Sequence, residues 1–305
     1  MFKFIVFRIL SVLVTVYIAM TTVFFGIRLA PGDPAQLLAG QQTQEDVKRA
    51  RQFLGLDAPI YIQYLKFLRG VIRGDLGVSA LTRRSVSEEI VRCIPATFTL
   101  LAASMVLTAV LGVPAGVVCA LMPGTVWDFL IMLLVVGALS VPNFWLGMLM
   151  IELFSVRLGW LPSFGFSGLK TAIMPAIAVA ARQVAVTTRM TRVSMLEVLG
   201  EDYLKVALAK GLGTWSVVLK HGLRNALLPV ITSLGLQAGF LLGGSIVIEV
   251  LFAWPGIGQL LINAITMRDY NLIQGITIVY VGGFLLIMLF MDLCYALVDP
   301  RIHYE

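Results

Sequence analysis

Long apolar runs alternate with short polar segments along most of this 305-residue chain. A helix of about 20 apolar residues is long enough to cross the hydrocarbon core of a bilayer. The pattern predicts six such helices, at residues 9–30, 97–121, 129–154, 171–193, 226–252 and 273–298. The first run follows Lys3 and Arg8, as in a signal peptide, but it is long and no cleavage pattern follows it. We therefore interpret it as a retained span of an all-α polytopic membrane protein.

The composition supports this interpretation. Hydrophobic residues make up 59% of the chain and charged residues 13%, whereas soluble domains average about 45–50% and 25%. The net charge of +6 is spread over the loops, so it indicates membrane topology and not nucleic-acid binding. The three cysteines form neither a disulfide framework nor a metal-ligand pattern. We expect no metal site.

Basic residues between the fourth and fifth predicted spans set the expected orientation. This loop contains Arg189, Arg192, Lys205, Lys210, Lys220 and Arg224, whereas the loops after the third and fifth spans contain few basic residues. The positive-inside rule places residues 189–225 in the cytoplasm, and both termini with them. The turn at residues 122–128, between spans two and three, has no basic residue to support its inside position.

The outer segment, residues 31–96, is not expected to be disordered. Apolar residues recur at helical spacing within residues 47–54 and again within residues 60–68. This periodicity predicts short amphipathic helices that pack on the spans. Gly70, Gly74 and Gly77 are predicted to form turns.

A polar, basic segment at residues 201–229 interrupts the apolar pattern. It begins with a predicted short helix, Glu201 to Lys210, in which Glu201 and Lys205 have the spacing of an i,i+4 ion pair. Gly211 is the residue type preferred just after a helix end. Two interpretations remain open: an amphipathic connector on the lipid surface, or a contact with another protein, which the small Ala207 would favour.

Two further features lie inside the predicted spans. Gly235, Gly239 and Gly243 are spaced four residues apart, which allows helix backbones to approach closely, either within the subunit or as a sliding contact with a partner. Arg182 lies about 10 Å inside the membrane, counting from Arg189. Its side chain either faces a cavity, where it would attract a carboxylate, or extends to the cytoplasmic interface.

Two strings in the loop resemble the inner-loop signature of ABC importer permeases: Glu201-Asp-Tyr-Leu-Lys-Val-Ala-Leu-Ala-Lys-Gly-Leu212 and Lys220-His-Gly-Leu-Arg-Asn-Ala-Leu-Leu-Pro229. Further strings, including Leu29-Ala-Pro-Gly-Asp-Pro34 and Trp254-Pro-Gly-Ile-Gly258, are similar to the dipeptide, oligopeptide and nickel branch. Within this branch, residues 217–225 and 235–245 are most similar to permeases of glutathione importers. The general signature begins Glu-Ala-Ala, where this chain has Lys205-Val-Ala207.

This resemblance implies a six-span permease subunit of an ATP-driven importer of short peptides, with glutathione as the leading candidate. It implies a multi-pass protein of the bacterial inner membrane, with a second and usually different permease, two ATP-binding subunits and a periplasmic substrate-binding protein. ATP and Mg²⁺ would bind to the ATPase subunits. This chain has neither a Walker-type motif nor a catalytic constellation, so it is expected to bind no cofactor and to catalyse no reaction.

The resemblance also implies roles for individual residues. The helix between spans four and five would be a coupling helix seated in a groove of one ATPase, with this set of contact residues: Glu201, Asp202, Tyr203, Leu204, Ala207, Lys210, Gly211 and Arg224. Arg182 and Arg189 are the candidate solute-pathway residues. The expected organisation is the first span with a periplasmic segment (1–94), a permease core (95–298) with a coupling loop at 194–225, and a cytoplasmic tail (299–305).

Two alternatives remain. One is a permease for nickel or a metal chelate. The other is a stand-alone secondary transporter or channel, which predicts acidic residues deep within the spans to bind the coupling ion. Glu152 and Asp292 are the acids inside the predicted spans, and both lie towards span ends.

Overall fold

A computed structural model describes residues 2–39, 43–213 and 216–298. These residues are helical apart from their connecting turns and an isolated bridge between Val78 and Ser85. The elements in chain order are α1 (Phe2–Leu29), α2 (Pro34–Ala39), α3 (Gln44–Leu54), α4 (Ile60–Ile72), α5 (Val86–Leu107), η1 (Thr108–Gly112), α6 (Val113–Leu121), α7 (Val126–Ser140), α8 (Asn143–Met150), η2 (Ile151–Arg157), α9 (Leu169–Leu199), α10 (Asp202–Ala209), η3 (Val217–Gly222), α12 (Leu223–Gly244), α13 (Ile246–Leu251), α14 (Ile257–Thr266) and α15 (Tyr270–Val298). The predicted all-α class is confirmed, and the predicted tail at 299–305 lies outside the described residues.

Five helical segments of the described chain are long and apolar enough to cross a membrane, and a bent pair could be a sixth. The five are Ile9–Leu29, Val86–Leu121, Leu169–Leu199, Val217–Gly244 and Tyr270–Leu289. Each overlaps a predicted span. The second begins well before its predicted start at residue 97, because the helix extends back to Val86.

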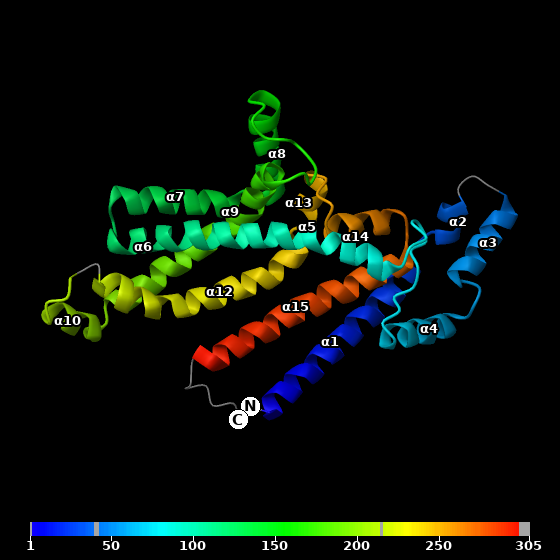
Figure 1. The fold of residues 1–305 in the computed structure, drawn as a ribbon, viewed down its shortest axis with the longest axis horizontal. Coiled ribbons are helices and arrows are strands. Elements are labelled where there is room, and N and C mark those ends of the chain that lie inside the picture. Colours follow the sequence, from blue (N-terminus) through cyan, green and yellow to red (C-terminus); the bar gives the residue numbers. More distant parts are fainter. Residues whose placement is uncertain (1, 40–42, 214–215, 299–305) are drawn as a thin grey trace. The chain divides into compact units, whose positions relative to one another are not determined.

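The predicted third span, residues 129–154, is wrong as a single straight helix. The chain bends by 103° between α7 and the segment Asn143–Arg157 (Figure 1). Pro142 explains the break, because it lacks an N–H group and disfavours helical backbone at the residue before it. Val141 accordingly adopts ψ 126°.

The predicted fifth span, residues 226–252, is divided as well. α12 ends at Gly244, where two adjacent glycines weaken the helix, and α13 follows Ser245. Buried Ser245 donates its hydroxyl to Glu249 Oε1 at 3.2 Å.

One compact unit contains residues up to Thr97 together with Pro255–Leu286. Its core joins the start of α5 to α14 and α15, with buried Val86, Ile90 and Ile276 at its centre. The predicted amphipathic helices α3 and α4 are present, and α4 packs on α1 through a 2.7 Å hydrogen bond between Tyr64 Oη and Thr21 Oγ1. Gly74 lies in a turn at positive φ, and Gly77 has positive φ without forming a turn. Gly70 is wrong as a turn because it lies within α4.

Polar side chains begin two helices of this unit. Thr97 Oγ1 accepts a 2.8 Å hydrogen bond from Ile257 N in the first turn of α14. Asp269 is buried and accepts from Leu272 N at 3.2 Å, as an N-cap of α15 does. Its second carboxylate oxygen accepts from the Ser79 hydroxyl at 2.6 Å.

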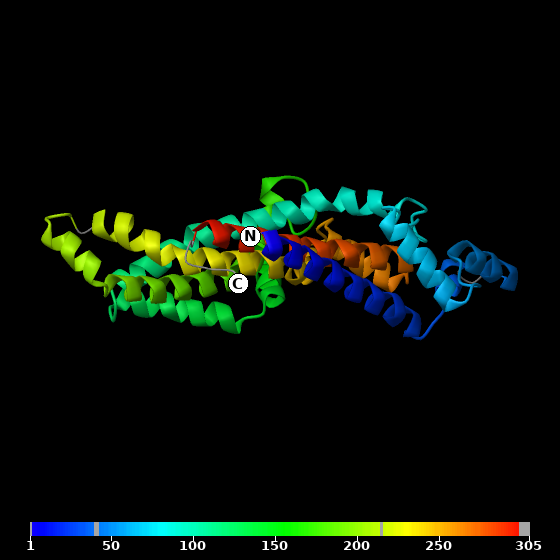
Figure 2. The same cartoon turned by 90° about the horizontal axis from the view of Figure 1, so that it is seen from below.

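The second compact unit contains Phe98–Trp254 and the later part of α15. The long helix α9 lies at its centre and packs against α6, α7, α8 and α12. Two glycines bring α6 and η1 close to α9: a Cβ on Gly116 would lie 2.6 Å from Thr188 O, and one on Gly112 would lie 2.9 Å from Thr187 Cβ. Within this unit, the α6–α7 turn and α10 lie near one end of α9, and α8 and α13 lie near the other (Figures 1 and 2).

Candidate functional site

The predicted helix after α9 is present as α10, and it packs on η3 and the start of α12. Leu204 is 2% exposed and points into this contact. The Tyr203 hydroxyl accepts a 2.7 Å hydrogen bond from Asn225 Nδ2 and donates to His221 O at 3.4 Å. These contacts hold α10 against the start of the following helix.

Both ends of α10 show why the helix is short. Gly211 has φ +82°, and Leu212 N donates to Ala207 O at 3.4 Å, which is the hydrogen bond of a Schellman-type helix end. The predicted Glu201–Lys205 pair is wrong: Lys205 Nζ lies 2.7 Å from Asp202 Oδ1. Glu201 precedes the first helical residue, so its side chain is not stacked on the face that carries Lys205.

The remaining surface of α10 faces away from the unit. Glu201, Asp202, Tyr203 and Lys210 are exposed, and Val206 is 52% exposed. Ala207 is half-buried, Gly211 is exposed, and Arg224 is exposed in the first turn of α12. The structure therefore gathers seven of the eight predicted coupling residues at the exposed part of this end, while Leu204 lies beneath them. Their role as ATPase contacts stays a prediction.

A buried ion pair that the sequence did not reveal lies beside this end of α9. Arg192 donates from Nε to Asp128 Oδ1 and from Nη2 to Asp128 Oδ2, both at 2.8 Å. Asp128 also accepts from Gly124 N at 3.0 Å. The side chains are 8% exposed for Asp128 and 26% for Arg192. The α6–α7 turn is thus fixed to the end of α9 that leads into α10.

In the sequence, the local feature associated with this ion pair is the position of Asp128 in the first turn of α7. Asp128 lies three residues after Thr125, whose hydroxyl accepts from Asp128 N at 3.5 Å as the helix N-cap. An acid in a first helical turn is favourable without any partner, so this position alone does not indicate an arginine partner 64 residues away.

Arg182 lines a pocket of about 360 Å³ inside the second unit. The pocket is formed where α7 and α8 bend apart and where α12 gives way to α13; Val141, Pro142 and Gly244 contribute to its wall. The Arg182 side chain is exposed, and its Nη1 donates to Leu139 O at 3.5 Å. The guanidinium therefore remains accessible for a further acceptor.

The solute-pathway candidate Arg182 lies far along α9 from the predicted coupling residues at α10. Arg182 precedes the end of α9 by 17 residues, which is about 25 Å along a helix axis. Arg189 is exposed on the same helix and does not line the Arg182 pocket.

The predicted glycine stripe on α12 has two different environments. Gly235 and Gly239 are buried on a helix that packs against α9. Gly243 is exposed, and a Cβ there would meet no atom within 4 Å in the described structure.

Comparisons with known proteins give the family. The model described as "Binding-protein-dependent transport system inner membrane component" matches residues 112–304, and the model of the corresponding N-terminal region matches residues 1–101. The glutathione transport system permease protein GsiC of Escherichia coli (strain K12) is 43% identical over 306 residues, covering 100% of both chains. The protein of the same name from Shigella dysenteriae serotype 1 is equally similar, at 43% identity and 100% coverage of both chains.

A solved structure shows the same fold. A chain of the MetNI methionine ABC transporter in an inward-facing conformation aligns with a TM-score of 0.56 and 21% identity, covering 69% of this chain and 96% of that one. Together with the apolar helices, these matches show that the chain belongs to the binding-protein-dependent transport system inner membrane components, as a multi-pass ABC importer permease of the dipeptide, oligopeptide and nickel branch.

Proposed function

We propose that this permease imports glutathione or similar short peptides. The observation that carries the proposal is the 43% identity, over the full length of both chains, to permeases named for glutathione transport. The accessible guanidinium of Arg182 in a pocket between broken helices supports it, because a cation at such a site would attract the carboxylates of a peptide.

The transporter that we propose contains this chain, a second permease that is a different chain, two ATPase subunits and a periplasmic binding protein. ATP and Mg²⁺ bind to the ATPases, and this chain binds neither. Both termini and α10 lie in the cytoplasm. The α6–α7 turn lies there too, and its hydrogen bonds to Arg192 support its position at the same end as α10.

Coupling to ATP hydrolysis would run through the exposed surface of α10. This surface combines the apolar side chain of Val206 with the charged side chains of Asp202 and Lys210, as expected for a protein contact. A photo-crosslinking amino acid at Val206 should join the chain to an ATPase subunit in the assembled transporter. The same label at Val156, 66% exposed on η2 of the same unit, should not. Equal crosslinking from both positions would contradict the coupling role of α10.

Uptake by the reconstituted transporter tests the solute. Proteoliposomes that contain the permeases and ATPases, supplied with the binding protein and ATP, should accumulate labelled glutathione in preference to dipeptides or nickel. Nickel accumulation in its place would favour the first alternative, a metal permease. Uptake by this chain alone without nucleotide would favour the second, a secondary transporter.

The role of Arg182 needs its own comparison. Arg182→Gln should lower the rate of peptide uptake while leaving assembly with the partner subunits unchanged, and Arg189→Gln tests the second pathway candidate in the same way. Lys170→Gln is the matched control, because it removes an exposed cation at the start of the same helix. Wild-type uptake by Arg182→Gln would exclude this residue from the pathway.

A further inference from the structure

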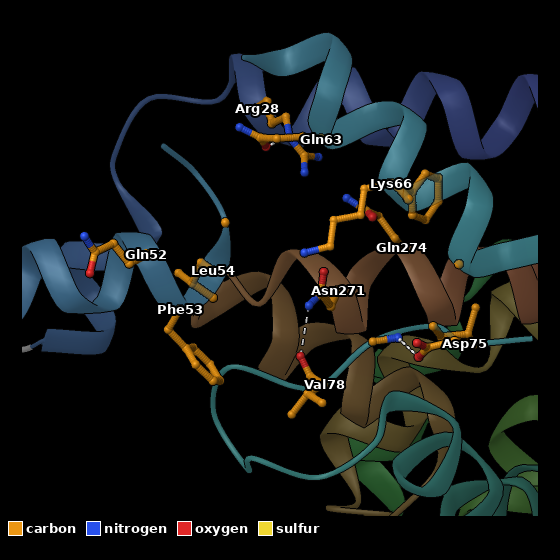
Figure 3. A pocket seen from close by; sticks show the side chains of 15 residues that line it. Arg28, Gln52, Phe53, Leu54, Gln63, Lys66, Asp75, Val78, Asn271 and Gln274 are labelled. Atoms are coloured by element: carbon orange, nitrogen blue, oxygen red, sulfur yellow. Dashed lines mark hydrogen bonds between the residues drawn. The ribbon is translucent and has the colours of Figure 1, made fainter. Parts of the chain in front are cut away.

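A second pocket, lined by both polar and apolar side chains, lies within the other compact unit, and none of its lining residues belongs to the candidate sites described above. Its volume is about 360 Å³, and its walls come from the end of α1, from α3 and α4, and from the start of α15. Pockets of this size suit a small molecule or a headgroup. Figure 3 shows Lys66 extending from α4 into the space between Gln63 and Asn271.

Several polar side chains of this pocket have hydrogen-bond donors available. Lys66 is exposed and forms no ion pair or hydrogen bond with any residue that the structure describes. Arg28 donates from Nε to Gln63 Oε1 at 3.1 Å and from Nη1 to Phe24 O at 3.0 Å, which leaves its Nη2 protons available. Asn271 uses one amide proton for Val78 O, at 2.9 Å, and keeps the other.

Gln274 is the observation that points to a ligand. Its side chain lines the pocket and is only 2% exposed, yet its Nε2 has no hydrogen-bond partner among the described residues. A buried amide without a partner is unfavourable. A ligand atom that accepts a hydrogen bond would satisfy it.

The charge of the lining selects an anion. Lys66 and Arg28 supply two positive charges, and Asp75 is the one carboxylate in the lining. Asp75 is exposed, and its Oδ1 already accepts from Gly77 N at 2.9 Å. The balance of one net positive charge and several free donors fits a singly or doubly charged oxyanion.

The surroundings of the pocket favour a phosphate group among the possible oxyanions. Arg28 lies in the last turn of α1, at the end of the membrane-spanning segment Ile9–Leu29, where lipid headgroups begin. The adjoining α4 exposes apolar side chains, among them Leu65 at 62% and Ile72 at 85%, as helices at a lipid interface do. We propose that this pocket binds a phosphate group through Lys66, Arg28 and Gln274, supplied by a phospholipid headgroup or by a soluble phosphate ester. The proposal is independent of which solute the permease transports.

Ligand-induced thermal stabilisation of the purified full-length chain in neutral detergent tests the proposal and separates the two sources. One titration uses phosphatidylglycerol, with diacylglycerol of the same acyl chains as the phosphate-free control. The other uses soluble glycerol phosphate. Stabilisation by phosphatidylglycerol alone assigns the site to lipid, and stabilisation by glycerol phosphate assigns it to a soluble ester. No stabilisation by either phosphate, or equal stabilisation by diacylglycerol, overturns the proposal.

Variants connect the stabilisation to this pocket. Lys66→Gln should weaken the apparent affinity about tenfold, as expected for the loss of a charged hydrogen bond. Lys48→Gln, which removes an exposed lysine from α3 of the same unit, should retain wild-type affinity. Gln274→Leu should unfold at or above the wild-type temperature without ligand, because it removes an unsatisfied amide, and should also weaken binding about tenfold. Wild-type affinity in Lys66→Gln or Gln274→Leu overturns the assignment.

Discussion

The ion pair between Asp128 and Arg192 gives the most direct test of how the α6–α7 turn is attached to α9. We consider Asp128→Asn, which preserves the shape of the side chain and removes its charge. Asparagine would leave Arg192 one neutral oxygen acceptor and replace the other with an NH₂ group, so one of the two 2.8 Å hydrogen bonds would be lost and the other would no longer be to a charged acceptor. Within the described residues, Asp128 is the acidic side chain that pairs with Arg192.

The magnitude follows from the exposure of the two side chains. A hydrogen bond to a charged group contributes about 1.5–3 kcal/mol, and breaking a fully buried pair costs about 3–5 kcal/mol. Arg192 keeps 26% of its side-chain exposure, so water would compensate part of the loss. We expect Asp128→Asn to lower the free energy of unfolding by about 2 kcal/mol.

The chain supplies its own control. Asp202 and Lys205 also form a 2.7 Å ion pair, but their side chains are 92% and 66% exposed. Asp202→Asn should therefore change the free energy of unfolding by less than about 0.5 kcal/mol. Unfolding of the full-length chain in mixed detergent micelles measures both variants. Arg192→Gln and the double variant complete a cycle whose coupling energy should be about 2 kcal/mol. Equal losses for Asp128→Asn and Asp202→Asn would refute the conclusion that burial strengthens this pair.

Three further predictions follow from backbone contacts, and each is measured by the same unfolding titration. Gly116→Val should destabilise by about 1–3 kcal/mol through overpacking against α9, whereas Gly243→Ala, with open space around its Cβ, should not destabilise. Thr97→Val should cost about 1 kcal/mol, because Ile257 N loses its acceptor; wild-type stability would show that water replaces this bond. Gly211→Ala should cost about 1 kcal/mol, since φ is +82° there, whereas Gly213→Ala, at a residue without positive φ, should cost less.

The sequence predicted the apolar helices well because each depends on a local property. Twenty consecutive apolar residues must form a helix in lipid, whatever their neighbours do. The breaks within two predicted spans were also encoded locally, at Pro142 and at the glycine pair 243–244. They were missed because apolar length outweighed these residues in the interpretation. A proline in an apolar run is compatible with a kinked span or with a complete break, and only the packing around it decides between the two.

The contacts of the candidate site could not be predicted in the same way. Asn225 follows Tyr203 by 22 residues, and the hydrogen bond between them depends on how α10 folds back onto the next helix. The partners Asp128 and Arg192 lie on different helices. Periodicity identifies which face of a helix is apolar, but it does not identify which polar side chain of another helix will meet it. The pairing of Lys205 with Asp202 in place of Glu201 likewise depended on the helix starting one residue later than expected.

The second unit combines tightly packed contacts with two interrupted helices, and the two features have different consequences. Gly112 and Gly116 leave no room for a side chain between α9 and its neighbours, and the Asp128–Arg192 pair fixes the adjoining turn. Displacement of α10 would therefore move these helix ends together with α9. The backbone breaks after Ser140 and Gly244 instead lie at the pocket that contains Arg182. Discontinuous helices commonly form the substrate sites of transporters, because backbone groups released from a helix can contact solute there. The same arrangement makes Arg182 the stronger of the two arginine candidates for solute contact, since Arg189 lies on the continuous part of α9 and outside this pocket.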